Sequence, residues 1–362
     1  MRVTLFGDLP EEQWPSMARY GQSLAADLRA QKGLELSVYP EPTSPVARRR
    51  GLVLARRALV HPCRCRLRQG QVNHVLDHSY GHLLYFIDPR RSVVTCHDLA
   101  PLAYPDGGRT LSLSMLLWRW AFQGTLRAAR IIADSASTRD DLVRFGGYSA
   151  DRIEVVPLGV MPAFFAPPRP EDAALRPAMA PPGTPLILHV GNCERRKNIE
   201  GLLEALARLR FSAGGPQARL WQIGGRFTEA QRSLISRLGL DARVQQTSHV
   251  PEETLPGCYR AADLLALPSW YEGFGFPVLE AMAASTPVVC SDRASLPEVA
   301  GDAALVVDPA DLEALAGALE RGLHDAALRR ELVEGGRERA ARFTWAATAA
   351  RTRAVYEQVV TA

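Results

Sequence analysis

The chain has 362 residues, of which 47% are hydrophobic and 23% are charged, and its formal net charge is +4. This composition is close to that of an average soluble globule and excludes a disordered chain, a collagen and a coiled coil. At roughly 100–200 residues per domain, the length predicts two domains.

The N-terminus, the hydropathy and the cysteines indicate the cellular compartment. Acidic residues follow the short apolar run at residues 2–6, which is not the pattern of a signal peptide. No apolar run reaches the length of about 18 residues that a membrane-spanning helix needs. Six cysteines are scattered along the chain, and without a signal peptide reduced thiols are the default. We therefore expect a cytoplasmic protein.

Short apolar runs typical of strands alternate with amphipathic segments typical of helices along the first half of the chain. Two of the helical segments are residues 16–31 and 110–129. This alternation predicts a parallel sheet with helices on both faces. The predicted strands are residues 2–6, 34–39, 72–77, 92–98, 130–135 and 153–159.

A proline-rich segment then interrupts the alternation. Residues 162–185 contain eight prolines among small and polar residues, a composition that resists packing. We therefore predict a linker over residues 166–184. It separates a predicted first domain, residues 1–165, from a predicted second domain, residues 185–345.

The alternation resumes after this segment and predicts a second doubly wound α/β domain. Ligands of such domains bind outside the carboxyl ends of the strands, so we expect the site in the cleft between the two domains. The predicted strands are residues 186–191, 218–225, 243–250, 264–269, 287–292 and 304–308. The predicted helices are residues 197–210, 228–239, 252–262, 276–285, 311–324 and 327–342, with a last helix after Trp345.

Several common functional motifs are missing from the sequence. It contains no Gly-x-x-x-x-Gly-Lys-Ser/Thr loop, no Gly-x-Gly-x-x-Gly after the first strand, no Gly-x-Ser-x-Gly and no Asp-x-Asp. His78 and His82 have the spacing of a zinc-binding helix, but the glutamate that acts as base in a metalloprotease is missing. These absences argue against a P-loop protein, a serine hydrolase and a metal-held diphosphate.

The loop after the predicted strand 264–269 carries the richest chemistry. Gly273 and Gly275 let the backbone approach a ligand closely, and the helix that follows offers unpaired N–H groups to an anion. We expect Glu272 on this loop and Glu280 in the first helical turn. Both carboxylates can then accept hydrogen bonds from the hydroxyls of a ribose or a hexose.

A second loop, after the predicted strand 186–191, is rich in cations. Arg195, Arg196 and Lys197 directly precede a predicted helix. A helix start is unfavourable for cations unless an anion offsets them. The three side chains therefore indicate a polyanion such as a diphosphate.

These two loops, in this order, resemble those of family 4 of the retaining nucleotide-sugar glycosyltransferases. The resemblance covers the second domain and, more loosely, the first. It implies an α/β GT-B fold, in which two Rossmann-like domains face a central cleft and a terminal helix, residues 346–362, crosses back to the first domain. The motifs are Gly191 to Asn198, Pro251 to Asp263, Glu272-x7-Glu280, Thr286 to Asp292 and Leu296-Pro-Glu298, with Thr95 to Asp98, Ala133 to Thr138 and Val156 to Val160 in the first domain.

The resemblance also implies roles for individual residues. Arg196 and Lys197 would hold the diphosphate of a nucleotide-diphosphate sugar, and Glu280 would bind its ribose. Glu272 would bind the transferred sugar, while His97 would face the reacting centre. The leaving phosphate would deprotonate the acceptor, so that no enzyme nucleophile, cofactor or metal is expected. The other implied donor contacts are Asn192, Val250, Gly273, Phe274, Gly275 and Phe276.

The acceptor side would belong to the first domain, with a glycan or a lipid-linked hydroxyl as acceptor. Asp98 stands beside His97 at a predicted strand end, and His78, Tyr80 and His82 form a nearby polar group. We predict that these four residues lie on the acceptor side, near His97.

The sequence departs from the family at two places. Many relatives carry arginine where this chain has Asn192, so Arg195 or Arg196 would replace one diphosphate contact. Relatives also carry a glycine pair near the first strand, where this chain has Asp8-Leu-Pro-Glu-Glu. This second difference predicts an unusual acceptor side.

A basic interval lies between Glu41 and Asp77, with eight arginines and no acid between those two residues. Residues 48–68 mix arginines with apolar residues, which suits an anionic membrane or a phospholipid-linked acceptor; a merely solvated surface is the alternative. Nucleic acid is disfavoured because no aromatic residues are interleaved. Cys63 and Cys65 are too crowded with the nearby histidine for a good tetrahedral metal site.

We predict a metal-independent, retaining hexosyltransferase that is peripheral to the cytoplasmic face of a membrane or free in the cytoplasm. GDP-mannose is the favoured donor, because residues 196–198 and 97–98 are most similar to those of mannosyltransferases. Two alternatives stay open: a non-catalytic nucleotide-sugar-binding protein, and a sugar-nucleotide epimerase with the same two-domain plan. A periplasmic solute-binding protein shares the cleft, but the expected signal peptide is missing.

Overall fold

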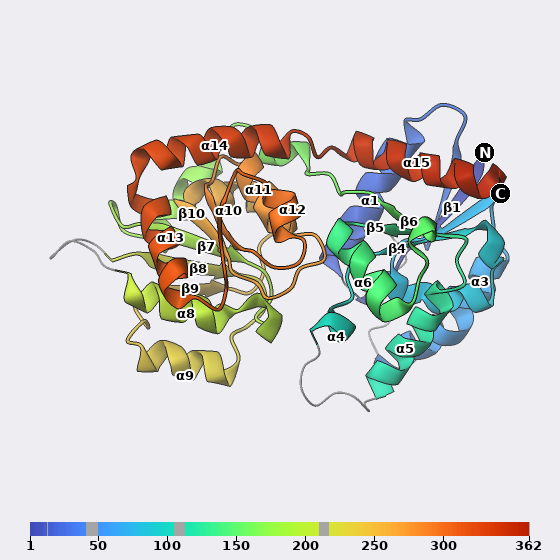
Figure 1. The fold of residues 1–362 in the computed structure, drawn as a ribbon, viewed down its shortest axis with the longest axis horizontal. Helices are drawn as coiled ribbons and strands as arrows, with labels where there is room; N and C mark the ends of the chain where they lie inside the picture. Colours follow the sequence, from blue (N-terminus) through green and yellow to red (C-terminus); the bar gives the residue numbers. More distant parts are fainter. Residues whose placement is uncertain (13, 41–49, 105–112, 210–216, 362) are drawn as a thin grey trace. The chain divides into compact units, whose positions relative to one another are not determined.

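The structure is a computed structural model that describes residues 1–12, 14–40, 50–104, 113–209 and 217–361. The chain divides into two compact units (Figure 1). The first unit comprises Met1–Gly159 and Thr344–Ala362, and the second comprises Val160–Phe343. Within the described ranges, no helix combines the length and the hydrophobicity needed to cross a bilayer.

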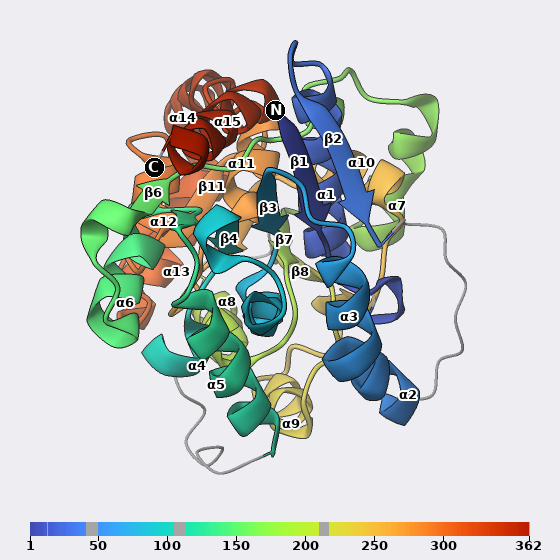
Figure 2. The same ribbon diagram turned by 90° about the vertical axis from the view of Figure 1, so that its right-hand side faces the viewer.

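The first unit is built on a parallel six-stranded sheet in the order β2-β1-β3-β4-β5-β6. Strand β2 is therefore an edge strand, and Figure 2 shows it beside β1. Every strand lies within a segment predicted from its apolar run. The strands are β1 (Arg2–Phe6), β2 (Glu35–Tyr39), β3 (Val72–Val75), β4 (Ser92–Cys96), β5 (Arg130–Ala133) and β6 (Ile153–Val155).

Helices cover both faces of this sheet. On one face, Tyr20 of α1 bonds Thr95 of β4 at 2.8 Å, and Tyr356 of α15 lies 2.6 Å from Nδ1 of His74 in β3. On the other face, apolar strand residues pack against α3, α5 and α6. The helices are α1 (Pro15–Arg29), α2 (Arg50–Ala55), α3 (His61–Arg66), α4 (Ala100–Ala103), α5 (Leu113–Thr125), α6 (Ala136–Gly146) and α15 (Trp345–Thr361), with a π-helical turn η2 (Arg56–Val60) and the 3-10 turns η1 (Pro10–Glu12), η3 (His78–Tyr85), η4 (Pro89–Arg91) and η5 (Ala150–Arg152).

The second unit repeats this plan with a parallel six-stranded sheet in the order β12-β11-β10-β7-β8-β9. Strands β7 and β10 are neighbours although three helices and two strands separate them in sequence. The strands are β7 (Leu186–Val190), β8 (Arg219–Ile223), β9 (Val244–Thr247), β10 (Leu264–Leu267), β11 (Val288–Ser291) and β12 (Leu305–Val307). The helices are α7 (Leu175–Met179), α8 (Ile199–Arg208), α9 (Glu229–Arg237), α10 (Leu255–Ala261), α11 (Phe276–Ala283), α12 (Leu296–Ala300), α13 (Leu312–His324) and α14 (Ala326–Ala340), with the turns η6 (Pro162–Phe164), η7 (Pro170–Ala174), η8 (Arg195–Lys197) and η9 (Glu252–Thr254).

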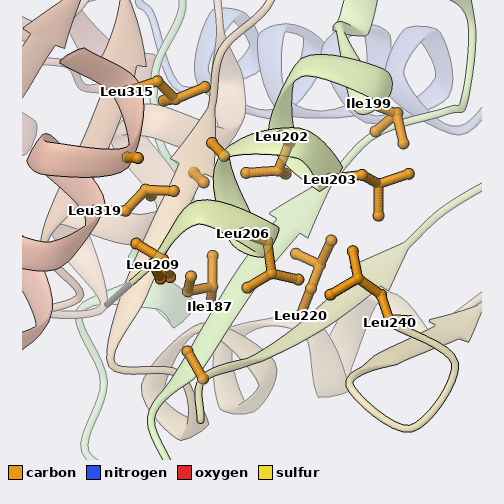
Figure 3. Packing of buried hydrophobic residues seen from close by; sticks show 14 of the residues in the cluster. Ile187, Ile199, Leu202, Leu203, Leu206, Leu209, Leu220, Leu240, Leu315 and Leu319 are labelled. Atoms are coloured by element: carbon orange, nitrogen blue, oxygen red, sulfur yellow. The ribbon is translucent and has the colours of Figure 1, made fainter. Parts of the chain in front are cut away.

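Helix α8 shows how the sequence pattern builds the core of the second unit. Leu202, Leu203 and Leu206 recur at the spacing of one helical face and are fully buried. They pack with Ile187 of β7 and Leu220 of β8 in one apolar cluster (Figure 3). This packing fixes the start of α8, which directly follows the cationic loop.

The predicted linker, residues 166–184, is a packed part of the second unit. Asp172 is buried and forms an ion pair with Arg260 of α10 at 2.6 Å. Arg176 of α7 reaches Asp263 at 2.8 Å. Composition misled the prediction because charged pairs with residues distant in sequence help to attach the proline-rich segment. The boundary between the units accordingly falls after Gly159 instead of after residue 165.

Candidate active site

Two loops meet at the carboxyl edge of the second sheet. One follows β7 and the other follows β10, and these two strands are neighbours. The backbone N–H of Trp270 in the second loop donates to the carbonyl of Arg196 in the first at 2.8 Å. The sheet order therefore brings together the two segments that the sequence analysis singled out.

A buried ion pair joins the loops. The Nζ of Lys197 lies 2.6 Å from Oε1 and 2.8 Å from Oε2 of Glu272. The Ser269 hydroxyl donates to Oε1 of the same carboxylate at 2.7 Å. Burial alone would raise the pKa of Glu272, but the charges of Lys197 and Arg196 outweigh burial and lower that pKa. Glu272 is thus an ionised carboxylate that holds Lys197 in position.

Arg196 is the more accessible cation of this site, with 20% of its side chain exposed. Its Nε lies 2.9 Å from Glu194, and one terminal nitrogen lies 3.4 Å from Glu272. Two cations therefore share the buried Glu272 carboxylate. Glu194, the other partner of Arg196, is exposed. An ammonium and a guanidinium side by side are groups that form charge-assisted hydrogen bonds with phosphate oxygens.

The loop around Gly275 needs a glycine for two reasons. Its φ of +101° lies in the left-handed region, and a Cβ at this position would lie 2.6 Å from Cδ2 of Leu296. The Ser295 hydroxyl contacts the carbonyls of Glu272 and Phe274 at 2.9 Å each. The loop is thereby fixed at the N-terminus of α11, where a helix dipole favours an anion.

The structure places Glu280 differently from the prediction. It is the fifth residue of α11, in the second turn rather than the first, and it is buried. The Tyr259 hydroxyl of α10 donates to its Oε2 at 2.7 Å. A hydrogen bond from a neighbouring helix therefore orients the Glu280 carboxylate.

Two further predicted donor residues are half-buried. Asn192 follows Gly191 in the cationic loop, where its side chain accepts from the Glu194 N–H at 3.4 Å. Val250 follows β9, two strands away from β7 in the sheet. Their contacts with a donor stay predictions, as do those of Gly273, Phe274 and Phe276.

The buried Gln222 and the half-buried Gln246 support the glycine turns after β7 and β8. The sequence analysis missed both glutamines. The Gln222 amide donates to the carbonyl of Gly191 at 2.7 Å and to that of Gly224. Gln246, its register partner on β9, donates to Gln222 at 2.6 Å. A polar residue inside an otherwise apolar strand run was the available signal.

His97 lies at the carboxyl end of β4 in the first unit. Its Nδ1 contacts the Asp134 carboxylate at 2.6 Å, and its Nε2 contacts the Leu76 carbonyl at 2.8 Å. Because both partners are acceptors, both ring nitrogens carry a proton. Burial alone would lower the pKa of His97, but Asp134 outweighs burial and raises it to about 9. His97 is therefore an imidazolium whose two N–H groups both donate to acceptors within the first unit.

Carboxylates surround this end of the first sheet. Asp77 follows β3, Asp134 follows β5, and Asp8 follows β1. Burial, with the charges of Asp77 and Glu12, raises the pKa of Asp8 to about 8. The sequence analysis noted Asp8 only as a departure from the family, yet it belongs to the same polar edge as His97.

The predicted acceptor-side residues are mostly packed inside the first unit. Tyr80 is fully buried, with its ring under Arg57 at 4.1 Å, and its hydroxyl accepts from the Leu9 N–H at 3.0 Å. His82 is buried too, which lowers its pKa to about 4. His78 is likewise buried and makes an edge contact with Trp118.

Asp98 is the most exposed of the predicted acceptor-side group, yet it too has a local role. It is half-buried, and its carboxylate accepts from the Ala100 N–H at 3.0 Å, at the start of α4. The contact of these four side chains with an acceptor stays a prediction. In the described part of the chain, no three His, Cys, Asp or Glu side chains are grouped to hold a metal ion.

Comparison with known proteins identifies the family. The profile described as Glycosyltransferase Family 4 matches residues 17–164, and the profile described as Glycosyl transferases group 1 matches residues 172–339. The O-antigen chain mannosyltransferase B of Escherichia coli is 30% identical over 312 residues, which are 82% of this chain and 78% of the relative. The chain belongs to glycosyltransferase family 4. The resemblance noted in the sequence is thereby confirmed.

A second relative of this glycosyltransferase aligns over a smaller share of its own length. The MMP alpha-(1->4)-mannosyltransferase of Mycolicibacterium hassiacum is 34% identical over 234 residues, which are 64% of this chain and 54% of the relative. Among solved structures, the sucrose-phosphate synthase of Thermosynechococcus elongatus has a TM-score of 0.79 at 23% identity, covering 100% of this chain and 99% of that one. HepE of Anabaena, in complex with UDP and glucose, has a TM-score of 0.77 at 17% identity, covering 99% of this chain and 100% of its own. The two-unit α/β architecture is the GT-B fold, as predicted.

Proposed function

We propose that this glycosyltransferase moves a hexose from a nucleotide-diphosphate sugar to a hydroxyl of a glycan or lipid-linked acceptor, with retention of anomeric configuration. The observation that carries the proposal is the buried contact of Lys197 with Glu272, beside Arg196, where the loops after β7 and β10 meet. Two cations held by one carboxylate are placed to receive the diphosphate of a donor.

The chemistry follows from the charge that develops on the leaving group. As the glycosidic bond breaks, negative charge grows on the nucleoside diphosphate, and Lys197 and Arg196 stabilise it without reorganising. The leaving phosphate then takes the proton of the acceptor hydroxyl on the same face of the sugar. No enzyme nucleophile is required, and we propose that these side chains make a metal ion unnecessary. Full activity in a chelator would agree with this, and its loss would contradict it.

The remaining groups orient the donor. We assign Glu280 to the ribose hydroxyls and Glu272 to hydroxyls of the transferred sugar. His97 contributes a fixed positive charge at the carboxyl edge of the first sheet, because Asp134 and Leu76 occupy both of its N–H groups. Positioning and electrostatics then supply the catalysis.

Mannose from GDP-mannose is the donor we favour. Two relatives named as mannosyltransferases, at 30% and 34% identity, support this choice. A thermal-shift panel of GDP, UDP, ADP and dTDP with their sugars tests it, since a ligand of the native state raises the melting temperature. We expect GDP and GDP-mannose to give the largest shift.

Transfer itself needs a second measurement. The native protein incubated with GDP-mannose should release GDP only when a glycan acceptor is added. NMR of the product should then report an α-linkage. Binding without turnover would instead indicate a nucleotide-sugar-binding protein. Conversion of the donor without an acceptor would indicate an epimerase.

We also propose that the protein associates peripherally with an anionic membrane at the cytoplasmic face, where a lipid-linked acceptor would lie. Large apolar side chains are exposed within the arginine-rich segment, with Leu59 at 66% and Leu67 at 83%. An apolar surface among arginines suits the boundary between headgroups and acyl chains. Sedimentation with anionic liposomes tests this, with Leu59→Ser and Leu67→Ser expected to reduce the bound fraction.

A further inference from the structure

A cavity of about 560 Å³ lies in the first unit, along the edge strand β2. Its floor is the sheet face that carries Thr4, Ser37 and Tyr39, since register partners on adjacent strands share a face. Its walls come from η2, α3 and the loop before β3.

The apolar core of the first unit stops short of this cavity. Phe6, Cys65 and the partly buried Tyr39 belong to the apolar cluster on this sheet face. Towards the amino ends of β1 and β2, the same face carries Thr4 and Ser37 instead. Polar side chains in place of core residues leave a hollow between the sheet and α3, which is the property of a ligand pocket rather than of a packing defect.

The charge of the cavity is strongly positive. Four arginines and one glutamate line it. Arg56 is neutralised by an ion pair with Glu11. Among the described residues, no carboxylate forms an ion pair with Arg2, Arg64 or Arg68. Within the described lining, Glu35 is the single carboxylate beside these three guanidinium groups.

Contacts within the first unit order the Arg68 side chain. Arg64 and Arg68 are four positions apart, and Arg68 donates to the Arg64 carbonyl at 3.2 Å. The Arg68 guanidinium lies 4.6 Å from the ring centre of Tyr39. The Thr4 hydroxyl donates to the backbone carbonyl of Arg68 at 2.8 Å. Because this scaffold already orders Arg68, a ligand would lose little side-chain entropy in meeting it.

We propose that this cavity is a binding site for a phosphate-bearing, hydroxylated ligand, separate from the donor site, with Arg64 and Arg68 holding the phosphate. Guanidinium groups match phosphate oxygens in geometry and charge. Ser37, Glu35 and Gln69 offer hydrogen bonds to the hydroxyls of a sugar or glycerol part. A volume of about 560 Å³ is that of a small-molecule site.

The site is distinct from the candidate active site by its place in the fold. Arg2 and Glu35 open β1 and β2, and Gly70 precedes β3, so much of the cavity lies towards the amino ends of the strands. His97 and Asp134 lie at the carboxyl ends of the same sheet. The inference therefore does not depend on the donor assignment, which concerns the second unit.

The test uses inorganic pyrophosphate as probe, with the full chain carrying Lys197→Ala so that binding at the donor loops is weakened. Calorimetry should show one bound pyrophosphate per chain. Arg64→Gln with Arg68→Gln should raise its Kd by about a hundredfold or more, since the loss of each charge-assisted hydrogen bond weakens binding by about tenfold or more. Arg66→Gln is the matched control, because Arg66 is exposed on α3 and does not line the cavity.

A second arm distinguishes a soluble ligand from a lipid headgroup. Vesicles of phosphatidylglycerol in phosphatidylcholine are sedimented with the native chain, the double variant and the control. If the double variant loses vesicle binding and the Arg66→Gln control keeps it, a lipid phosphate is the source. Loss of pyrophosphate binding with unchanged vesicle binding identifies a soluble one. The proposal is overturned if the double variant binds both pyrophosphate and vesicles within about twofold of the native protein. It is also overturned if Arg66→Gln weakens binding as much as the double variant does.

Discussion

Lys197 and Glu272 are 75 positions apart in sequence, yet the ammonium of one lies within 2.8 Å of both carboxylate oxygens of the other. The contact exists because β7 and β10 are neighbours in the second sheet, so their loops leave from adjacent points of one edge. Both side chains are buried, and Ser269 completes the hydrogen bonding of Glu272. The pair is therefore a built feature of the site rather than a surface ion pair.

Replacement of Lys197 should lower donor use and also stability, because it removes a partner of the buried Glu272 carboxylate. Lys197→Ala removes one of the two side-chain cations that would stabilise the leaving group. The kcat/KM should therefore fall by about a hundredfold, the usual effect of losing one such charge. Lys197→Arg keeps the charge and should retain most of the activity. Steady-state kinetics measures both, and melting curves separate lost charge from lost structure. Equal activity of the two variants and the native enzyme would reject the diphosphate role.

His97 should titrate far above an ordinary histidine. Asp134 raises its pKa from 6.5 to about 9 in the folded state. The stabilisation that results is complete below about pH 6.5 and is lost as the pH rises through about 9. NMR of the imidazole ring gives the pKa directly, and melting temperatures between pH 6 and 10 give the linkage.

Asp134→Asn removes the charge that holds the proton on His97. We expect the pKa of His97 to fall and the pH dependence of the melting temperature to weaken over the same interval. Asp98→Asn is the control, because the Asp98 carboxylate accepts from the Ala100 N–H at the start of α4. A native His97 that titrates at or below 6.5 would contradict the imidazolium assignment.

The sequence was informative about elements and much less so about which elements meet. Every strand of the described residues lies within a predicted segment, and central strands such as β4 and β10 are buried on both faces and leave a continuous apolar signature. Motifs also pointed to both loops of the candidate site. The contact between Lys197 and Glu272, however, depends on the order of strands in the sheet, which no local pattern encodes.

The errors have the same origin. Residues 166–184 were predicted as a linker because proline-rich composition indicates weak packing, whereas Asp172 finds its partner Arg260 88 positions away. Tyr80 and His82 were predicted on the acceptor side; both are buried inside the first unit, and their contact with an acceptor stays a prediction. His97 was singled out correctly as a polar residue at a strand end, while its partner Asp134 became visible only from the adjacency of β4 and β5.

Glu280 and Tyr259 should act together on nucleotide affinity. Glu280→Ala removes the proposed ribose contact and should raise the Kd of the bare nucleotide. Tyr259→Phe keeps the carboxylate but removes the hydrogen bond that orients it, and should raise the Kd by about two- to tenfold, as expected for one hydrogen bond of about 0.5–1.5 kcal/mol. Calorimetry with GDP measures both variants. Unchanged binding in Glu280→Ala would remove this residue from the ribose site.

The turn at Gly275 should be sensitive to a single methyl group. Gly275→Ala places a Cβ 2.6 Å from Leu296 at a backbone φ of +101°, so strain and overlap add. We expect a loss of about 2–4 kcal/mol in the free energy of unfolding, together with weaker nucleotide binding, because the same loop leads into α11. Gly239→Ala is the matched control in the same unit, since its φ is +65° and nothing lies within 4 Å of the added carbon. That variant should lose only about 1 kcal/mol from the left-handed backbone and keep its nucleotide affinity. Urea unfolding and calorimetry compare the two, and equal losses would show that Leu296 moves away freely and that the turn is not a rigid part of the site.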